Sequence, residues 1–110
     1  MLLIDNLGVS FIEGGWPGAS PKEEEFFETA KRELNLKNAK LVSFGSTRKL
    51  DLSAKDDPQV KALVDSGTDY VCIVGKSSKL HITKALQTDI DSAIDMAVDT
   101  ILYLKSKGKK

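Results

Sequence analysis

The sequence predicts an α/β fold built from parallel βα repeats, and three observations support it. Short apolar runs rich in Val, Ile and Phe occur at Val9–Glu13, Lys40–Phe44 and Tyr70–Gly75. Each run ends in glycine or small polar residues, as buried parallel strands do. Helical patterns separate the runs, and the strand starts recur roughly every thirty residues, the length of one βα unit.

The first two helices are expected between these strands. Lys22–Leu34 follows Ser20, a good cap, and Pro21, which suits a helix start, while glutamates in its first turn favour the positive end of the helix dipole. Pro58–Ser66 carries a short apolar stripe, and Gly67 is expected to stop it.

The last helix has the clearest pattern. From Asp89 to Ser106, apolar residues follow a 3.6-residue rhythm that ends near Gly108. Residues 1–7 resemble the end of another helix, with Gly8 as its stop. The order is that of one domain over residues 1–110, either a small open doubly wound sheet or a piece of a larger (β/α)8 barrel.

Composition excludes several classes of protein. Lys plus Arg and Asp plus Glu both total 16, so no net charge favours nucleic acid or an anionic membrane. No apolar stretch approaches the ~20 residues that span a bilayer, and the start does not resemble a signal peptide, so a cytoplasmic location is expected. The single cysteine, Cys72, excludes an internal disulfide or a cysteine-based zinc site; we expect it to be a small buried residue.

Candidate functional residues lie where the strands end, because ligands bind beyond the carboxyl ends of parallel strands. Glu13 ends the first strand, where it can accept hydrogen bonds from substrate hydroxyls, fix a cation, or pair with Arg48 on the next strand. Arg48 suits a substrate carboxylate, the alternative being a surface arginine.

Two further residues follow the strand ends. His81 is the only histidine; alone it cannot build a metal site, and a loop histidine is often a local hydrogen-bonding partner. Trp16 either covers the strand ends as a lid or caps the edge of the core. Neither a pair of carboxylates with divided acid and base roles nor a Ser-His-Asp order appears, so we assign no catalytic residue and no metal ligand.

Three ordered segments carry a family resemblance. They are "FIEGGWPGASPKE" (11–23), "LVSFGSTRK" (41–49) and "IVGKSSKLHITKALQT" (73–88). They resemble the citramalate synthase branch of the isopropylmalate/homocitrate synthase family, and the likeness extends over essentially the whole chain. The resemblance implies a partial TIM barrel, with three parallel strands corresponding to barrel strands two to four and with flanking helices.

The resemblance also implies a chemistry. Family members are metal-dependent acyltransferases that condense acetyl-CoA with a 2-oxo acid such as pyruvate. Glu13, Arg48 and His81 would then line the 2-oxo acid pocket, and Mg²⁺ or Mn²⁺ is expected in the complete enzyme but not in this part of it. We therefore expect a part of such an enzyme that is inactive alone. The alternative is a stand-alone βα module that binds a small anion or a partner chain.

The chain departs from the family pattern in two respects. Nothing before residue 9 supplies the Arg-Asp pair of the first barrel strand, and the later His-x-His ligands are absent. Ser78, Lys79 and Leu80 replace aromatic and acidic residues of the third motif. Because both edges of such a sheet would expose unpaired backbone, we also expect self-association through sheet edges or helix faces.

Overall fold

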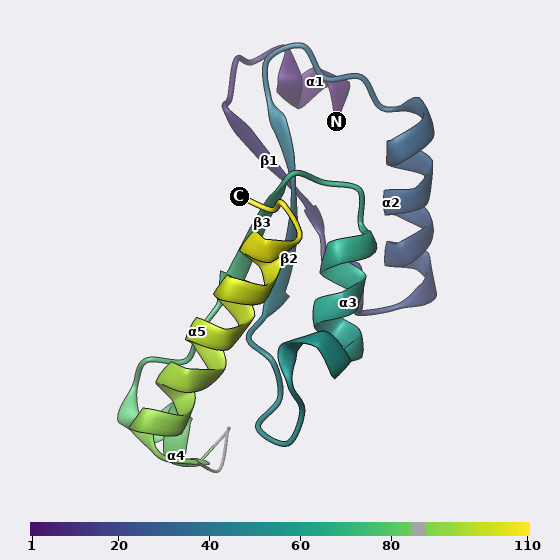
Figure 1. Ribbon diagram of the computed structural model, residues 1–110. Helices are drawn as coiled ribbons and strands as arrows, with labels where there is room; N and C mark the ends of the chain where they lie inside the picture. Colours follow the sequence, from purple (N-terminus) through teal and green to yellow (C-terminus); the bar gives the residue numbers. More distant parts are fainter. Residues whose placement is uncertain (85–87) are drawn as a thin grey trace.

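A computed structural model describes residues 1–84 and 88–110 and confirms the predicted fold class (Figure 1). Three parallel strands form an open sheet in the order β1-β2-β3, with helices alongside, as in part of a TIM barrel. In chain order the elements are α1 (Leu2–Asp5), β1 (Phe11–Gly15), α2 (Pro21–Glu33), β2 (Lys40–Ser46), the 3₁₀ helix η1 (Ala54–Asp56), α3 (Pro58–Asp65), β3 (Tyr70–Val74), α4 (Lys79–Lys84) and α5 (Ile90–Ser106).

Each strand has at least one end that differs by one or two residues from the sequence prediction. The first strand begins at Phe11 rather than Val9, because its pairing with β2 starts there, beside the hydrogen bond from Lys40 N–H to the carbonyl of Ser10 at 2.9 Å. The segment after β3, expected to be a loop, contains the short helix α4. The part of the third family-like segment at residues 85–87 lies outside the described residues.

The three long helices start where the sequence predicts. Ser20, Asp57 and Asp89 each accept a hydrogen bond from a backbone N–H in the first turn of α2, α3 and α5. Such caps satisfy amide groups that have no partner within the helix. No helix within residues 1–84 or 88–110 is long and apolar enough to cross a membrane.

The helices bury one face of the sheet. Residues that pair across parallel strands point to the same side, so the register and the two-residue alternation of side chains define two faces. On the covered face, Gly45 allows α3 to approach closely, because a Cβ there would lie 2.6 Å from a methyl carbon of Leu63. The core on this side joins α3, α5, η1 and β3, through Ala54, Val60, Leu63, Val64, Val71, Ile73, Tyr103 and Leu104.

The other side of the sheet, which we call the open face, has no helix packed on it within the described residues. Phe11 is 55% exposed and Val74 38% exposed, although both are large apolar residues in strands. Large apolar side chains are therefore accessible on this face of the sheet. The strand side chains of the open face are Phe11, Glu13, Lys40, Val42, Phe44, Ser46, Tyr70, Cys72 and Val74.

The free edge of β3 already carries some backbone pairing. Lys110 donates its N–H to the carbonyl of Asp69 at 2.8 Å and accepts the N–H of Val71 at 3.0 Å. These two bonds have the pattern of a parallel ladder. The C-terminus therefore lies against β3, as Figure 1 shows.

Candidate functional site

The carboxyl ends of the three strands lie at one edge of the sheet, with the connections that follow them and α4 (Figure 1). The ends of β2 and β3 are also tied together. Ser46 Oγ and the N–H of Thr47 both donate to the carbonyl of Val74, each at 3.4 Å. Parallel strands thus bring the three polar segments chosen from the sequence to one edge.

Glu13 lies on the open face of β1 and is exposed. It pairs in register with Val42, while Cys72 pairs with Phe44 on the other side of β2. Partial desolvation, and next the hydrogen bond and negative charge of the nearby Glu13 carboxylate, raise the pKa of the Cys72 thiol. The carboxylate therefore sits beside a neutral thiol group.

The expectation that Cys72 is buried is wrong, because its side chain is exposed. Its apolar surroundings in the sequence alternate between the two faces of β3, and Cys72 lies on the open one. In an uncovered sheet, an apolar run no longer means burial for every member.

The glycines after Glu13 are required by the fold itself. The register shifts between Glu13 and Gly15, which forms an irregularity in the strand, and Gly15 has φ 135°. A Cβ on Gly14 would lie 2.8 Å from a ring carbon of Phe26 on α2 and 2.9 Å from a methyl carbon of Leu41. The glycines allow the strand to turn and α2 to pack closely, whether or not a substrate approaches.

Trp16 packs edge to face on Phe44 at the carboxyl edge of the open face, with ring centroids 5.6 Å apart. Its indole Nε1 is buried and has no hydrogen-bond partner among the described residues. Trp16 also borders a cavity of about 450 Å³, whose other walls include Thr47, Arg48 and Gln59. This places Trp16 over a strand end, beside the connection that follows β2.

Arg48 follows β2 at the same edge, and its contacts are with the protein. Nε lies 2.6 Å from Oδ2 of Asp99 on α5, as an ion pair rather than a well-aligned hydrogen bond. Nη1 donates to the carbonyls of Lys49, Leu50 and Leu52. The pairing with Glu13 considered from the sequence is not the one that forms.

His81 lies on α4, after β3, and is exposed. Its backbone N–H donates to Ser78 Oγ at 3.2 Å, which helps the short helix to begin. Across residues 1–84 and 88–110, no hydrogen bond or ion pair links Glu13, Arg48 and His81 to one another. They share an edge of the sheet without forming a joined cluster.

A divalent cation does not fit the residues of this site. In the described parts of the chain, no three His, Cys, Asp or Glu side chains gather closely enough to hold a metal ion. Glu13 therefore offers a single carboxylate, which is too few ligands to hold a metal ion.

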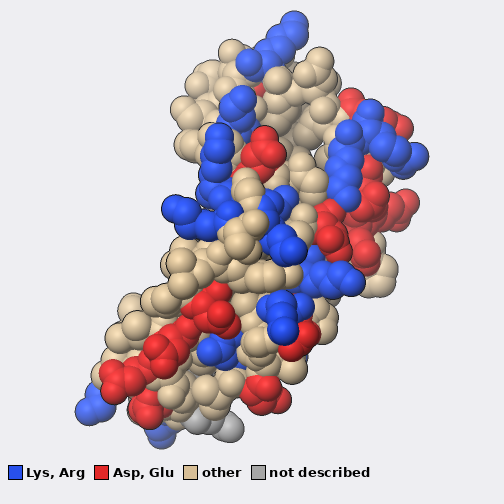
Figure 2. Space-filling model, viewed as in Figure 1, with Lys and Arg blue, Asp and Glu red and all other residues tan. Residues whose placement is uncertain are grey.

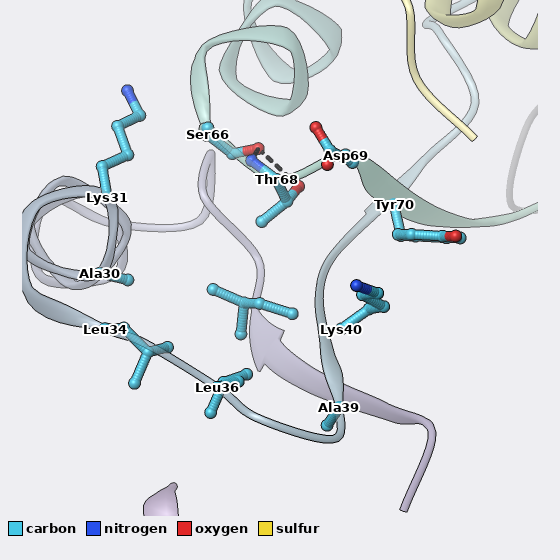
Figure 3. A pocket seen from close by; sticks show the side chains of 12 residues that line it. Ala30, Lys31, Leu34, Leu36, Ala39, Lys40, Ser66, Thr68, Asp69 and Tyr70 are labelled. Carbon is cyan, nitrogen blue, oxygen red and sulfur yellow. Dashed lines mark hydrogen bonds between the residues drawn. The ribbon is translucent and has the colours of Figure 1, made fainter. Parts of the chain in front are cut away.

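A second cavity, of about 290 Å³, lies at the opposite edge, where β2 and β3 begin (Figure 3). Figure 3 shows Lys31 of α2 and Leu34, which follows that helix, on one side of it, with Asp69 and Tyr70 on the other. Next to it, the hydroxyls of Ser43, Ser66 and Thr68 bond to one another in the interior, which no sequence pattern indicated. This cavity is far from the strand ends that carry the predicted site.

The charges do not form a surface of one sign. Figure 2 shows Lys and Arg side chains next to Asp and Glu over the visible face, with an acidic run along α5. A nucleic-acid interface requires a clustered positive surface. The visible face does not provide one.

Comparison with known proteins places this geometry in a family. The HMGL-like family model matches residues 1–110. The chain is 48% identical over 107 residues to (R)-citramalate synthase of Streptomyces coelicolor, covering 97% of this chain and 20% of that protein. It is 47% identical to (R)-citramalate synthase of Aquifex aeolicus, over 93% of this chain and 19% of that protein. It is 29% identical to 2-isopropylmalate synthase of Buchnera aphidicola subsp. Schizaphis graminum, over 91% of this chain and 18% of that protein. The chain thus spans about a fifth of the length of these relatives.

Proposed function

This chain belongs to the HMGL-like family, and we propose that it forms part of an acyltransferase that condenses acetyl-CoA with a 2-oxo acid, as a citramalate synthase does. The observation that carries the proposal is the position of Glu13. It is a carboxylate on the open face, at the carboxyl end of a parallel strand, where such folds bind their substrates.

We propose that Glu13 contacts the 2-oxo acid. A carboxylate at this position can accept a hydrogen bond from a hydroxyl group that forms as the carbonyl is attacked. The exposed aromatic and aliphatic side chains around it would be covered by further strands of a complete barrel, which would exclude water. His81, on the segment after β3, would approach the same pocket from its side.

Other parts of the reaction would come from outside this chain. A divalent cation, if the complete enzyme holds one, would be bound by residues beyond those described, because these make no metal site. We therefore expect no release of CoA when this chain alone is mixed with acetyl-CoA, pyruvate and Mg²⁺ or Mn²⁺. Release that is abolished by Glu13→Ala would show that the chain is more complete than we propose.

A segment exchange tests the proposal directly. This chain replaces the aligned segment of the Streptomyces coelicolor (R)-citramalate synthase, and CoA release is measured with acetyl-CoA and pyruvate. The hybrid should be active. Glu13→Gln in the hybrid should lower kcat/KM by about 100-fold or more, a common effect of losing one group that acts on the transition state.

Glu25→Gln is the matched control, because Glu25 is an exposed glutamate of α2. It should leave the activity of the hybrid unchanged. A folded hybrid without activity would contradict the proposed family chemistry. An active hybrid that tolerates Glu13→Gln would contradict the role of Glu13.

A further inference from the structure

We propose that Arg48 is a positioning residue that fixes the connection between β2 and α3, residues 47–57, onto α5, and does not contact substrate. The proposal rests on the proposed function in one respect: it takes the carboxyl edge of the sheet as the place where substrate binds. Its evidence is the set of contacts that the Arg48 side chain and its neighbours make within this chain.

The guanidinium holds the connection in a closed turn. Nη1 donates to the carbonyls of Lys49 at 3.1 Å, Leu50 at 3.4 Å and Leu52 at 3.0 Å. The carbonyl of Lys49 also accepts the N–H of Leu52 at 3.3 Å, whereas those of Leu50 and Leu52 accept no backbone N–H among the described residues and need another donor. The two N–H groups of Nη1 are shared among the three carbonyls, and charge-assisted bonds of this kind are the stronger ones.

The same side chain attaches the turn to α5. Its Nε lies 2.6 Å from Asp99 Oδ2, and the Arg48 side chain is only 16% exposed. Directly beside this pair, the backbone N–H of Arg48 donates to Oγ1 of Thr100 at 2.9 Å, and Thr100 is fully buried. Side chain and backbone of Arg48 thus reach two consecutive residues of one helix.

The far part of the connection is held by Asp99 as well, and by Asp57. Asp99 Oδ2 also accepts the N–H of Ala54 at 3.2 Å, and Asp57 Oδ2 accepts the N–H of Lys49 at 2.8 Å. An arginine that bound a substrate carboxylate would present its fork toward the ligand. In this chain Nε and Nη1 are directed at Asp99 and at the turn.

The position of the connection shapes the edge of the site. Thr47 and Arg48 line the cavity of about 450 Å³ together with Trp16, which packs on Phe44 of the open face. Trp16 is the only tryptophan of the chain. Its fluorescence therefore reports whether the connection stays in place.

The test is made on this chain, with Arg48→Met, Arg48→Lys and the control Lys49→Met. Lys49 is the adjacent exposed cation, and its side chain has no hydrogen bond or ion pair in the part of the chain that the structure describes. Limited proteolysis within residues 47–57 under native conditions and the Trp16 emission maximum are measured for each. Asp99→Asn and the double variant Arg48→Met/Asp99→Asn complete a cycle.

Arg48→Met should speed cleavage in residues 47–57 by about tenfold and shift Trp16 emission to the red, because local opening exposes the connection. Arg48→Lys should recover part of both effects, since it keeps the charge next to Asp99 but loses the fork. The double variant should be cleaved no faster, and its Trp16 emission shifted no further to the red, than Arg48→Met alone. Lys49→Met should behave as the unaltered chain does.

Cleavage and emission of Arg48→Met that equal those of Lys49→Met would overturn the proposal. If Arg48→Met does not fold, the test is made with Asp99→Asn and Arg48→Lys, by cleavage within residues 47–57 and by Trp16 emission. In the active hybrid, Arg48→Met that raises KM for pyruvate without altering cleavage or emission would show a substrate contact instead. An inactive hybrid would count against the proposed function and leave the cleavage result intact.

Discussion

Asp5 joins the N-terminal turn to the loop before β2, and its pKa gives this contact a pH dependence. Its carboxylate accepts backbone hydrogen bonds from Ala39 at 2.7 Å, Lys37 at 2.8 Å and Asn38 at 2.9 Å. The bond from Ala39, followed by that from Lys37, lowers the pKa of Asp5. A lowered folded pKa means that the ionised carboxylate stabilises the fold above the unfolded value, about 3.9, and that this contribution is lost as pH falls through the folded pKa.

Asp5→Asn should therefore lower the urea midpoint of unfolding at pH 7, and its effect should be smaller at about pH 3, because the stabilisation by the ionised carboxylate begins to be lost below the unfolded pKa. Unfolding followed by circular dichroism at both pH values measures this. Asp51→Asn, at an exposed aspartate, is the control and should change neither midpoint. An equal loss at both pH values would show that the charge of Asp5 is not what stabilises the contact.

Single residues were predictable when their role was local. Ser20 was recognisable as a helix cap, and Glu13 as a carboxylate at a strand end, from neighbouring residues alone. Asp5 was not, because its partners lie more than thirty positions along the chain. The ion pair of Arg48 with Asp99 was not predicted, because these two residues are also far apart in the sequence.

At the scale of elements, the close packing of α3 on β2 depends on Gly45. A methyl group there would lie 2.6 Å from Leu63 Cδ1, and Leu63 is fully buried. Gly45→Ala should lower the free energy of unfolding by about 1–3 kcal/mol through overpacking. Chemical denaturation measures the loss.

Gly75→Ala is the matched control, since a Cβ there would meet only Thr47 Cγ2, at an ordinary 3.8 Å. It should be neutral or slightly stabilising, because alanine restricts the unfolded chain. If both variants lose the same stability, α3 does not lie on β2 as described.

Whole elements were predictable in proportion to their length. The 17 residues of α5 display many turns of a regular apolar pattern, and the sequence indicated the helix clearly. The six residues of α4 include only two apolar positions, Leu80 and Ile82, which is too few to establish a period. The start of β1 depended on its pairing with β2, which no local pattern contains.

At the scale of the whole molecule, large apolar side chains remain exposed on helix α5 and on the open face. Leu102 is 62% exposed, Ile94 54% and Phe11 55%. Covering them would contribute about 25 cal/mol for each Å² removed from water, against the entropic cost of association. Self-association, expected from the sequence, stays a prediction.

Light scattering coupled to size-exclusion chromatography should show a mass that rises with concentration. Leu102→Lys should reduce that rise, while Lys61→Gln, at an exposed polar position of α3, should not. A single monomeric mass throughout, for a folded chain, would contradict the prediction.

The central claim is that three parallel strands gather their carboxyl ends, and with them Glu13, at one edge. Nuclear Overhauser effects between strands test it most directly. The account predicts that successive residues of β2 contact successive residues of β3 in the same direction, from Val42 beside Tyr70 to Phe44 beside Cys72. Hα–Hα contacts between the two strands should be weak, as in a parallel ladder. Strong Hα–Hα contacts that run in opposite directions along β2 and β3 would mean antiparallel strands and would contradict it.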